Sequence, residues 1–182
     1  MEEQIMKATG IVRRIDDLGR VVIPKEIRRT MRIREGDPLE IYTEKDGEVI
    51  FKKYSPIGEL GDFAVTYVET LAKTTGVGAC ITDRDTIIAV SGVPKKELME
   101  KRVSADLDRM MEEKKAVHPN EKAVAVTDSN DKYSAGVVFP IVSEGDSIGS
   151  VVFFMNESKP LGEVENKLAE SAAGFLGRHM EG

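Results

Sequence analysis

Six basic residues near the start of the chain have the types and spacing of an anion-binding surface. They are Lys7, Arg13, Arg14, Arg20, Arg28 and Arg29. Between Lys7 and Arg34 the sequence has nine Lys or Arg and three Asp or Glu, a local charge of +6, whereas the whole chain of 182 residues has a formal net charge of −6. A cationic segment in an acidic protein predicts an anionic target, and DNA is the leading hypothesis.

The alternative interpretation of these charges is a solvated surface, which is what most charge runs are. Clustering favours the binding site, because Arg13, Arg20, Arg28 and Arg29 are all arginines, whose planar fork suits phosphates and guanine edges. The segment between residues 7 and 34 contains no aromatic residue on which unpaired bases could stack. Duplex DNA is therefore favoured over single strands or RNA, and a dimer would double the arginine set across a two-fold axis.

Turn and helix signals predict the elements that position these residues. Residues 7–15 and 20–23 are predicted strands on either side of a turn, in which Gly19 tolerates a positive φ. Pro24 ends the second strand and opens a short helix over residues 25–31 that carries the last two arginines. After a turn at 34–38, alternating apolar residues around Asp46-Gly47 predict a β-hairpin.

Two domains are predicted, at residues 6–54 and 57–182, with a break at Ser55-Pro56-Ile57-Gly58. The first is too small to bury a core alone, so we expect a dimer whose strands interleave around one core. The second is predicted to be an α+β domain with an antiparallel sheet. Its predicted elements are a helix at 57–75 closed by Gly76, strands at 77–83 and 86–91, a helix from Pro94 to about Lys115, strands at 121–127, 134–143 and 147–154, and a helix at 160–180.

The first and last helices of the second domain each carry a narrow apolar stripe. Two such helices from each of several chains can pack as a bundle, which predicts an assembly role for this domain. The candidate contacts are Leu71, Leu168, Ala172 and Phe175.

Several kinds of chemistry are not expected. Cys80, the single cysteine, lies in an apolar run and is predicted to be buried and unreactive, and the isolated His118 and His179 do not suggest a metal or haem site. Asp83 and Asp85 are predicted to form a turn rather than an acid–base pair. Without a phosphate-binding loop or a nucleophile motif, we expect no enzyme activity and no cofactor. With no leader and no apolar run of about 20 residues, we expect a cytoplasmic protein without membrane contact.

Residues 6–30, with the core Gly19-Arg20-Val21-Val22-Ile23-Pro24, closely resemble the AbrB-type transition-state regulators. The resemblance implies an interlaced, swapped-hairpin β-barrel dimer that binds double-stranded DNA. It also implies that Arg13, Arg20, Arg28 and Arg29 are the DNA-contacting arginines, with Lys7 and Arg14 extending the same face. Residues 1–5 fall outside the pattern.

Residues 60–182 resemble a GAF domain in the order of their elements and in hairpins such as Thr82-Asp83-Arg84-Asp85. Together the two resemblances imply a transcriptional regulator of sporulation genes, an activator or a repressor, acting as a homodimer or homotetramer. The second domain is then a sensor of an unknown small-molecule effector or an oligomerisation domain.

Two other functions remain open at this point. Antitoxins that neutralise toxins share the barrel architecture, but a folded domain of about 120 residues replaces the disordered tail that such proteins use. A ligand-sensing protein that does not bind DNA is the other, and the cationic segment counts against it.

Overall fold

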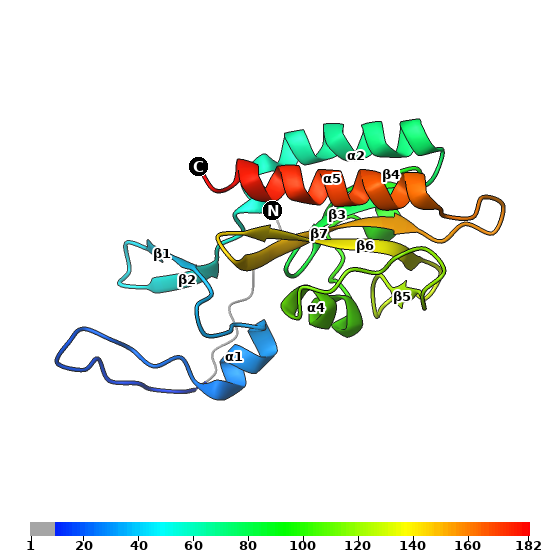
Figure 1. The fold of residues 1–182 in the computed structure, drawn as a ribbon. Helices are drawn as coiled ribbons and strands as arrows, with labels where there is room; N and C mark the ends of the chain where they lie inside the picture. Colours follow the sequence, from blue (N-terminus) through cyan, green and yellow to red (C-terminus); the bar gives the residue numbers. More distant parts are fainter. Residues whose placement is uncertain (1–9) are drawn as a thin grey trace. The chain divides into compact units, whose positions relative to one another are not determined.

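The computed structural model describes residues 10–182 (Figure 1). The chain divides into two compact units, residues 1–54 and 55–182. Among the described residues no helix has both the length and the apolar character needed to cross a membrane.

The N-terminal unit forms a short helix and a β-hairpin where the sequence predicts them. Their bounds are α1 Lys25–Met31, β1 Leu39–Thr43 and β2 Val49–Lys53. The helix begins after Pro24, whose fixed φ and missing N–H suit a helix start. β1 and β2 pair antiparallel with Ile41 opposite Phe51, and Gly47 turns between them with a φ of 86°. The predicted helix and the predicted hairpin around Asp46-Gly47 are confirmed.

The strands predicted at 7–15 and 20–23 are not formed within the described part of the single chain. Residues 7–9 lie outside the described part, and residues 10–15 and 20–23 carry no strand. At the turn, the N–H of Asp16 donates to the carbonyl of Arg20 at 3.0 Å, and the N–H of Gly19 donates to Asp16 at 3.1 Å. A strand needs a neighbour that pairs with its backbone groups, and these two arms have none among the described residues. The turn is confirmed, with a φ of 75° at Gly19.

The C-terminal unit is an α+β fold with a five-stranded antiparallel sheet in the order β4-β3-β7-β6-β5. Its elements are the 3-10 helix η1 Ile57–Leu60, α2 Gly61–Thr75, β3 Ala79–Asp83, β4 Ile87–Ser91, α3 Lys95–Leu98, α4 Ala105–Glu112, β5 Val124–Ala125, β6 Ser134–Ser143, β7 Asp146–Phe154 and α5 Glu163–His179. The predicted order of elements and the predicted antiparallel sheet are confirmed, although the strand predicted at 121–127 shrinks to the two residues of β5.

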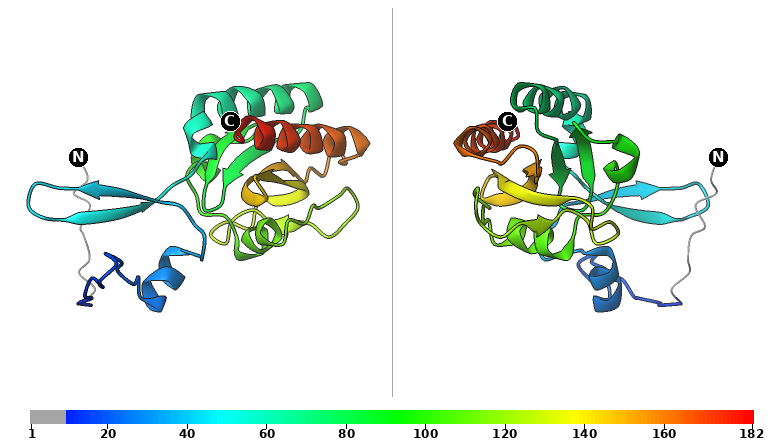
Figure 2. Two further views of the ribbon diagram at one scale, coloured as in Figure 1. Left: turned by 60° about the vertical axis from the view of Figure 1, so that its left-hand side comes forward. Right: turned by 90° about the vertical axis from the view of Figure 1, so that its right-hand side faces the viewer.

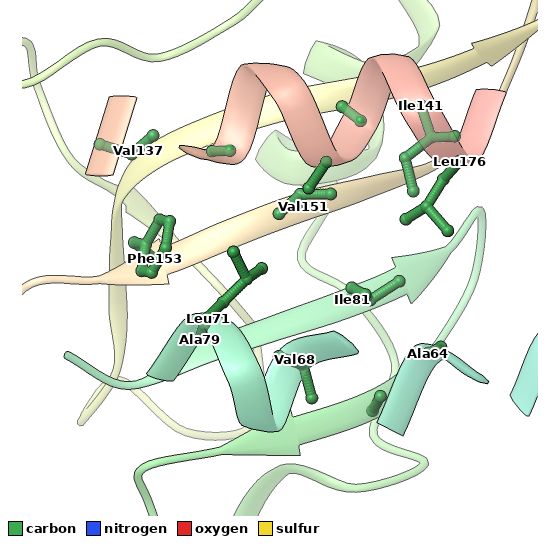
Figure 3. Packing of buried hydrophobic residues seen from close by; sticks show 14 of the residues in the cluster. Ala64, Val68, Leu71, Ala79, Ile81, Val137, Ile141, Val151, Phe153 and Leu176 are labelled. Carbon is green, nitrogen blue, oxygen red and sulfur yellow. The ribbon is translucent and has the colours of Figure 1, made fainter. Parts of the chain in front are cut away.

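The sheet separates two hydrophobic cores. Helices α2 and α5 lie side by side on one face and α4 lies on the other (Figures 1 and 2). Because side chains alternate along a strand, Ile81 and Val151 point toward α2 and α5, while Cys80 and Val152 point toward α4. Figure 3 shows part of the first core, in which buried residues of α2, β3, β6, β7 and α5 pack together.

The helix predicted from Pro94 to about Lys115 is broken into α3 and α4. Residues between them run along the edge of β4: the N–H of Ile87 donates to the carbonyl of Lys101 at 3.0 Å, and the N–H of Glu100 donates to Ile87 at 2.9 Å. Glu100 takes a φ of 61°, which ends α3. Ser104 then caps α4 by accepting a hydrogen bond from the N–H of Leu107 at 3.0 Å. Pairing of this segment with a sheet edge outweighs its helical periodicity.

Candidate nucleic-acid interface

A turn centred on an aspartate positions Arg20. Oδ1 of Asp16 accepts hydrogen bonds from the N–H of Leu18 at 3.0 Å and of Arg20 at 2.8 Å, and Oδ2 accepts one from Nε of Arg20 at 2.8 Å. Hydrogen bonds from the backbone and then the side chain of Arg20 lower the pKa of Asp16. The Arg20 side chain is 70% exposed, so its guanidinium remains open to a ligand while it is held in place.

The start of α1 positions Arg28. Its Nε donates to the carbonyl oxygen of Ile23 at 3.1 Å, and its backbone N–H donates to Pro24 at 3.0 Å. Because Ile23 and Pro24 directly follow the segment that begins with Arg20, both arginines are fixed to one turn–helix segment. Arg29 is exposed, and its side chain makes no hydrogen bond or ion pair within the part of the chain described.

The other end of α1 is closed by a left-handed residue. Arg32 has φ 52° and ψ 44°, a conformation that costs a non-glycine residue about 1–2 kcal/mol. Hydrogen bonds hold it there, because the N–H of Ile33 donates to the carbonyl of Arg28 at 2.8 Å and Nζ of Lys53 donates to the carbonyl of Arg32 at 2.8 Å. The second bond joins the end of β2 to the end of α1, so the helix is fixed relative to the hairpin.

The structure describes five of the six predicted interface residues, since Lys7 lies outside the described range. Arg13 and Arg14 are exposed in the arm before the turn, and no hydrogen bond or ion pair joins them to Arg20 or Arg28. Sequence reasoning did not assign a role to Asp16 beyond the turn. The signal was present: an aspartate that opens a tight turn and stands four residues before an arginine.

The large apolar side chains of residues 10–54 are exposed or half-buried. From residue 10 to residue 54, no Ile, Leu, Val, Met, Phe or Tyr is buried. Val12 is 89% exposed, and Ile41 and its partner Phe51 are exposed on one face of the hairpin. Burial of apolar surface is the main driving force of folding, so this unit needs a covering surface.

Helices α2 and α5 carry an aromatic surface, which we define as the exposed Phe63, Phe175 and His179 with the half-buried Tyr67. The ring centroids of Phe63 and Phe175 lie 6.0 Å apart, and the Phe63 ring also stacks on His179 at 6.0 Å and 8°. Tyr67 lies 6.1 Å from Phe175. A shallow groove beside Phe175 is lined by α5 residues. Its members are Ser171, Gly174, Phe175, Arg178 and His179.

Two of the four predicted assembly contacts are wrong. Leu71 and Ala172 are buried in the core beneath α2 and α5, at 4% and 0% exposure. Leu168 is half-buried, and Phe175 is 47% exposed within the aromatic surface. The predicted stripe lies at the boundary between the buried and the exposed face of α5, because Ala169, Ala173 and Leu176 form the face that packs against the sheet.

The space between the sheet and α4 is filled by side chains that include Leu107, Met111 and Tyr133. The Tyr133 hydroxyl donates to Oε2 of Glu97, and Nζ of Lys132 contacts the same carboxylate at 3.0 Å. The Tyr133 bond is the main cause of the lowered pKa of Glu97 and of the raised pKa of Tyr133. These contacts fasten the loop before β6 to α3.

The residues expected to be structural are so placed. Cys80 is fully buried, and burial raises the pKa of its thiol. His118 contacts Asn166 at 2.9 Å near the start of α5, whereas His179 is the last residue of that helix. Oδ1 of Asp83 accepts the N–H groups of Asp85 and Thr86 at 2.7 Å, as the predicted turn requires. Within residues 10–182 no group of three or more metal-ligating side chains is found.

Two family models match separate parts of the chain. Residues 59–181 match the family model described as Stage V sporulation protein T C-terminal, transcription factor. Residues 12–58 match the model described as Antidote-toxin recognition MazE, bacterial antitoxin. A GAF domain from an Acinetobacter phosphoenolpyruvate-protein phosphotransferase aligns with a TM-score of 0.53 at 13% identity, covering 66% of this chain and 81% of that one, which shows the fold alone.

Two curated relatives come from Bacillus subtilis (strain 168). Stage V sporulation protein T is 56% identical over 178 residues, covering 97% of this chain and 99% of that protein. The transition state regulatory protein AbrB is 63% identical over 51 residues, which is 28% of this chain and 52% of that protein. The molecule is thus a transcription factor with an AbrB-type N-terminal unit and a GAF-like C-terminal unit. The chain belongs to the stage V sporulation protein T family.

Proposed function

We propose that the chain is a sequence-specific DNA-binding regulator of sporulation genes, working in the cytoplasm without enzyme activity. Arg13, Arg20, Arg28 and Arg29 contact the duplex, and Lys7 and Arg14 extend the basic face. The observation that carries the proposal is the ordered turn–helix segment that holds Arg20 and Arg28 while leaving their guanidinium groups exposed. Such groups can bind phosphates for position and base edges for sequence.

The DNA-binding form is a homodimer whose arms interleave. Two features support this: the arms lack strand partners within the described chain, and apolar residues such as Val12, Ile41 and Phe51 are exposed. A second copy supplies both a neighbouring strand and a covering surface. The result is the swapped-hairpin barrel that the AbrB resemblance implies.

The C-terminal unit joins two or more of these DNA-binding dimers into one assembly. Residues 55–182 have 14 Lys or Arg and 21 Asp or Glu, a net charge of −7, which opposes direct contact with phosphates. The aromatic surface supports packing against another copy, giving a homotetramer. An effector between the sheet and α4 would have to displace buried side chains such as Leu107 and Met111, so assembly is the role that the packing favours.

The test is duplex binding by the full-length protein over a range of salt concentrations. If a dimer engages about six phosphates, log K should fall against log salt with a slope of about −5. Arg28→Ala and Arg29→Ala should weaken binding without changing the circular dichroism spectrum. Arg109→Ala is the matched control, because Arg109 is an exposed arginine of α4 in the acidic unit. Normal binding by a variant lacking Arg13, Arg20, Arg28 and Arg29 contradicts the assignment.

A second function rests on the antitoxin family model matched by residues 12–58. A segment of 51 residues is 63% identical to AbrB, and a folded unit, residues 55–182, takes the place of an extended tail. Limited proteolysis separates the two functions. A toxin-binding tail would be cleaved at once, whereas residues 55–182 should resist digestion as a packed unit.

A further inference from the structure

Two arginines of the candidate interface are held in the same way. Nε of Arg20 donates to Oδ2 of Asp16 at 2.8 Å, and Nε of Arg28 donates to the carbonyl of Ile23 at 3.1 Å. In the part of the chain that the structure describes, no hydrogen bond reaches the Nη atoms of either residue. Each guanidinium is therefore held at Nε, and its Nη1 and Nη2 atoms remain available.

This arrangement selects a binding geometry. A guanidinium binds a phosphate or a guanine edge through a pair of N–H groups, and an occupied Nε leaves the Nη1–Nη2 pair for that purpose. Ordering a free, rotamer-rich side chain at an interface lowers affinity, and a side chain that is already held avoids much of this cost. The Asp16–Arg20 contact spans four positions of one chain, so it needs no residue from a second copy.

We propose that Asp16 is a positioning residue for DNA recognition, which holds the Arg20 guanidinium through Nε so that its Nη edge meets the duplex. The inference rests on the proposed function, in which the N-terminal unit binds DNA. Asp16 itself does not touch the DNA. Its negative charge repels phosphates, so its positioning role acts against its direct electrostatic effect.

Other features of the turn agree with this role. Oδ1 alone serves the two backbone N–H groups, which leaves Oδ2 for the Arg20 side chain. Hydrogen bonds from Arg20 lower the pKa of Asp16, so the carboxylate stays ionised at neutral pH. Arg28 is held by a backbone carbonyl that no side-chain substitution removes. The effect of holding an arginine through Nε can therefore be tested at the Asp16–Arg20 turn.

The decisive variant is Asp16→Asn in the full-length protein. The asparagine carbonyl still accepts the backbone N–H groups that shape the turn, but its NH₂ group cannot accept a hydrogen bond from Nε of Arg20. Asp17→Asn is the matched control. It removes the same charge at the neighbouring exposed residue, whose side chain has no hydrogen-bond partner among the described residues. The probe is a duplex that the wild-type protein selects from a random-sequence pool.

For Asp16→Asn, the loss of a negative charge alone and the proposed positioning role predict changes in DNA affinity of opposite sign. Asp17→Asn should bind equally well or about twofold more tightly, because one repulsive charge is lost. Asp16→Asn should bind about three- to tenfold more weakly, the cost of ordering an arginine that is no longer held. In an Arg20→Ala background, Asp16→Asn should cause no further weakening. Circular dichroism and thermal melting of Asp16→Asn should match those of Asp17→Asn.

The proposal is overturned if Asp16→Asn binds as tightly as Asp17→Asn, or if it weakens the Arg20→Ala protein by the same factor as the wild type. Arg20→Lys gives a test that leaves the turn intact. An ammonium group cannot be held by Asp16 and present a fork at the same time, so binding should fall at least as far as in Asp16→Asn. Wild-type affinity in Arg20→Lys refutes the positioning role. Failure of the wild-type protein to select any duplex instead refutes the proposed function.

Discussion

Gly177 in α5 lies directly against the backbone carbonyl of Val142 in β6, with no space for a side chain between them. Gly174, three residues earlier on the same helix, has open space at the same position. Both glycines lie inside α5, so replacing either one by alanine has the same effect on helix propensity. A difference between the two variants therefore reports the packing around the glycine. The contact with Val142 sets how closely α5 approaches the β6–β7 hairpin.

We predict that Gly174→Ala and Gly177→Ala change stability in opposite directions. Alanine gains about 1 kcal/mol of helix propensity over glycine at either site. At Gly177 the added methyl group must push the Val142 backbone away, at a cost of about 1–3 kcal/mol. Denaturant unfolding of the two variants should show Gly174→Ala more stable than wild type and Gly177→Ala less stable. Equal stabilisation by both substitutions contradicts the close approach.

We predict that the hydrogen bond from Tyr133 to Glu97 stabilises the protein in a pH-dependent way. Because the folded pKa of Glu97 is lowered, the contribution is present above the ordinary carboxyl pKa of 4.5 and is lost as the pH falls through the lowered value. Because the folded pKa of Tyr133 is raised, the contribution is also lost as the pH rises through that value.

Thermal melting of Tyr133→Phe tests this prediction. Its melting temperature should lie below that of wild type at neutral pH, and the gap should narrow in acid because protonated Glu97 is a weaker acceptor. Tyr67→Phe is the control, since the Tyr67 hydroxyl has no hydrogen-bond partner within residues 10–182. A gap that stays constant from neutral to acidic pH shows that the Glu97 carboxylate is not the source.

We predict that the isolated segment 1–54 folds only as a dimer, because its apolar side chains are exposed in the single chain. Its melting temperature should therefore rise with protein concentration, as mass action requires for an associating system. Sedimentation at the same concentrations gives the mass. A monomer with a concentration-independent melt rules out the interleaved barrel.

We predict that the C-terminal unit raises the affinity for DNA by linking DNA-binding dimers of the N-terminal unit. On DNA with two phased sites, the full chain should bind about 100-fold or more tightly than residues 1–54, since the second contact becomes intramolecular. On DNA with one site the difference should be small. Phe175→Ser, which alters the aromatic surface, should remove the two-site advantage and leave one-site binding intact. An equal loss on both DNAs excludes the tethering account.

Much of the local structure could be predicted because it depends on residues close together in the chain. The turn at Gly19, the helix after Pro24 and the hairpin at Asp46-Gly47 each follow from backbone preferences within a few positions. Residue type and clustering indicated a basic surface, and the resemblance to AbrB-type regulators predicted which of its arginines contact DNA. The hydrogen bond that holds Arg20 could not be predicted, because the sequence indicates that Asp16 opens a turn but not which atom of Arg20 it contacts.

The tertiary structure decided what periodicity could not. The helical pattern from Pro94 to Lys115 is interrupted because residues 100–103 pair with residues 85–87 at the start of β4, a contact that the local sequence does not reveal. The apolar stripe on α5 did not show which residues meet the sheet, since Leu176 and Phe175 are both apolar and only packing against β6 buries the first and exposes the second. The sequence by itself determined the short-range turns, the helix and the basic segment. Contacts between distant residues decided the buried faces and the break between α3 and α4, because burial and strand pairing are properties of the assembled fold.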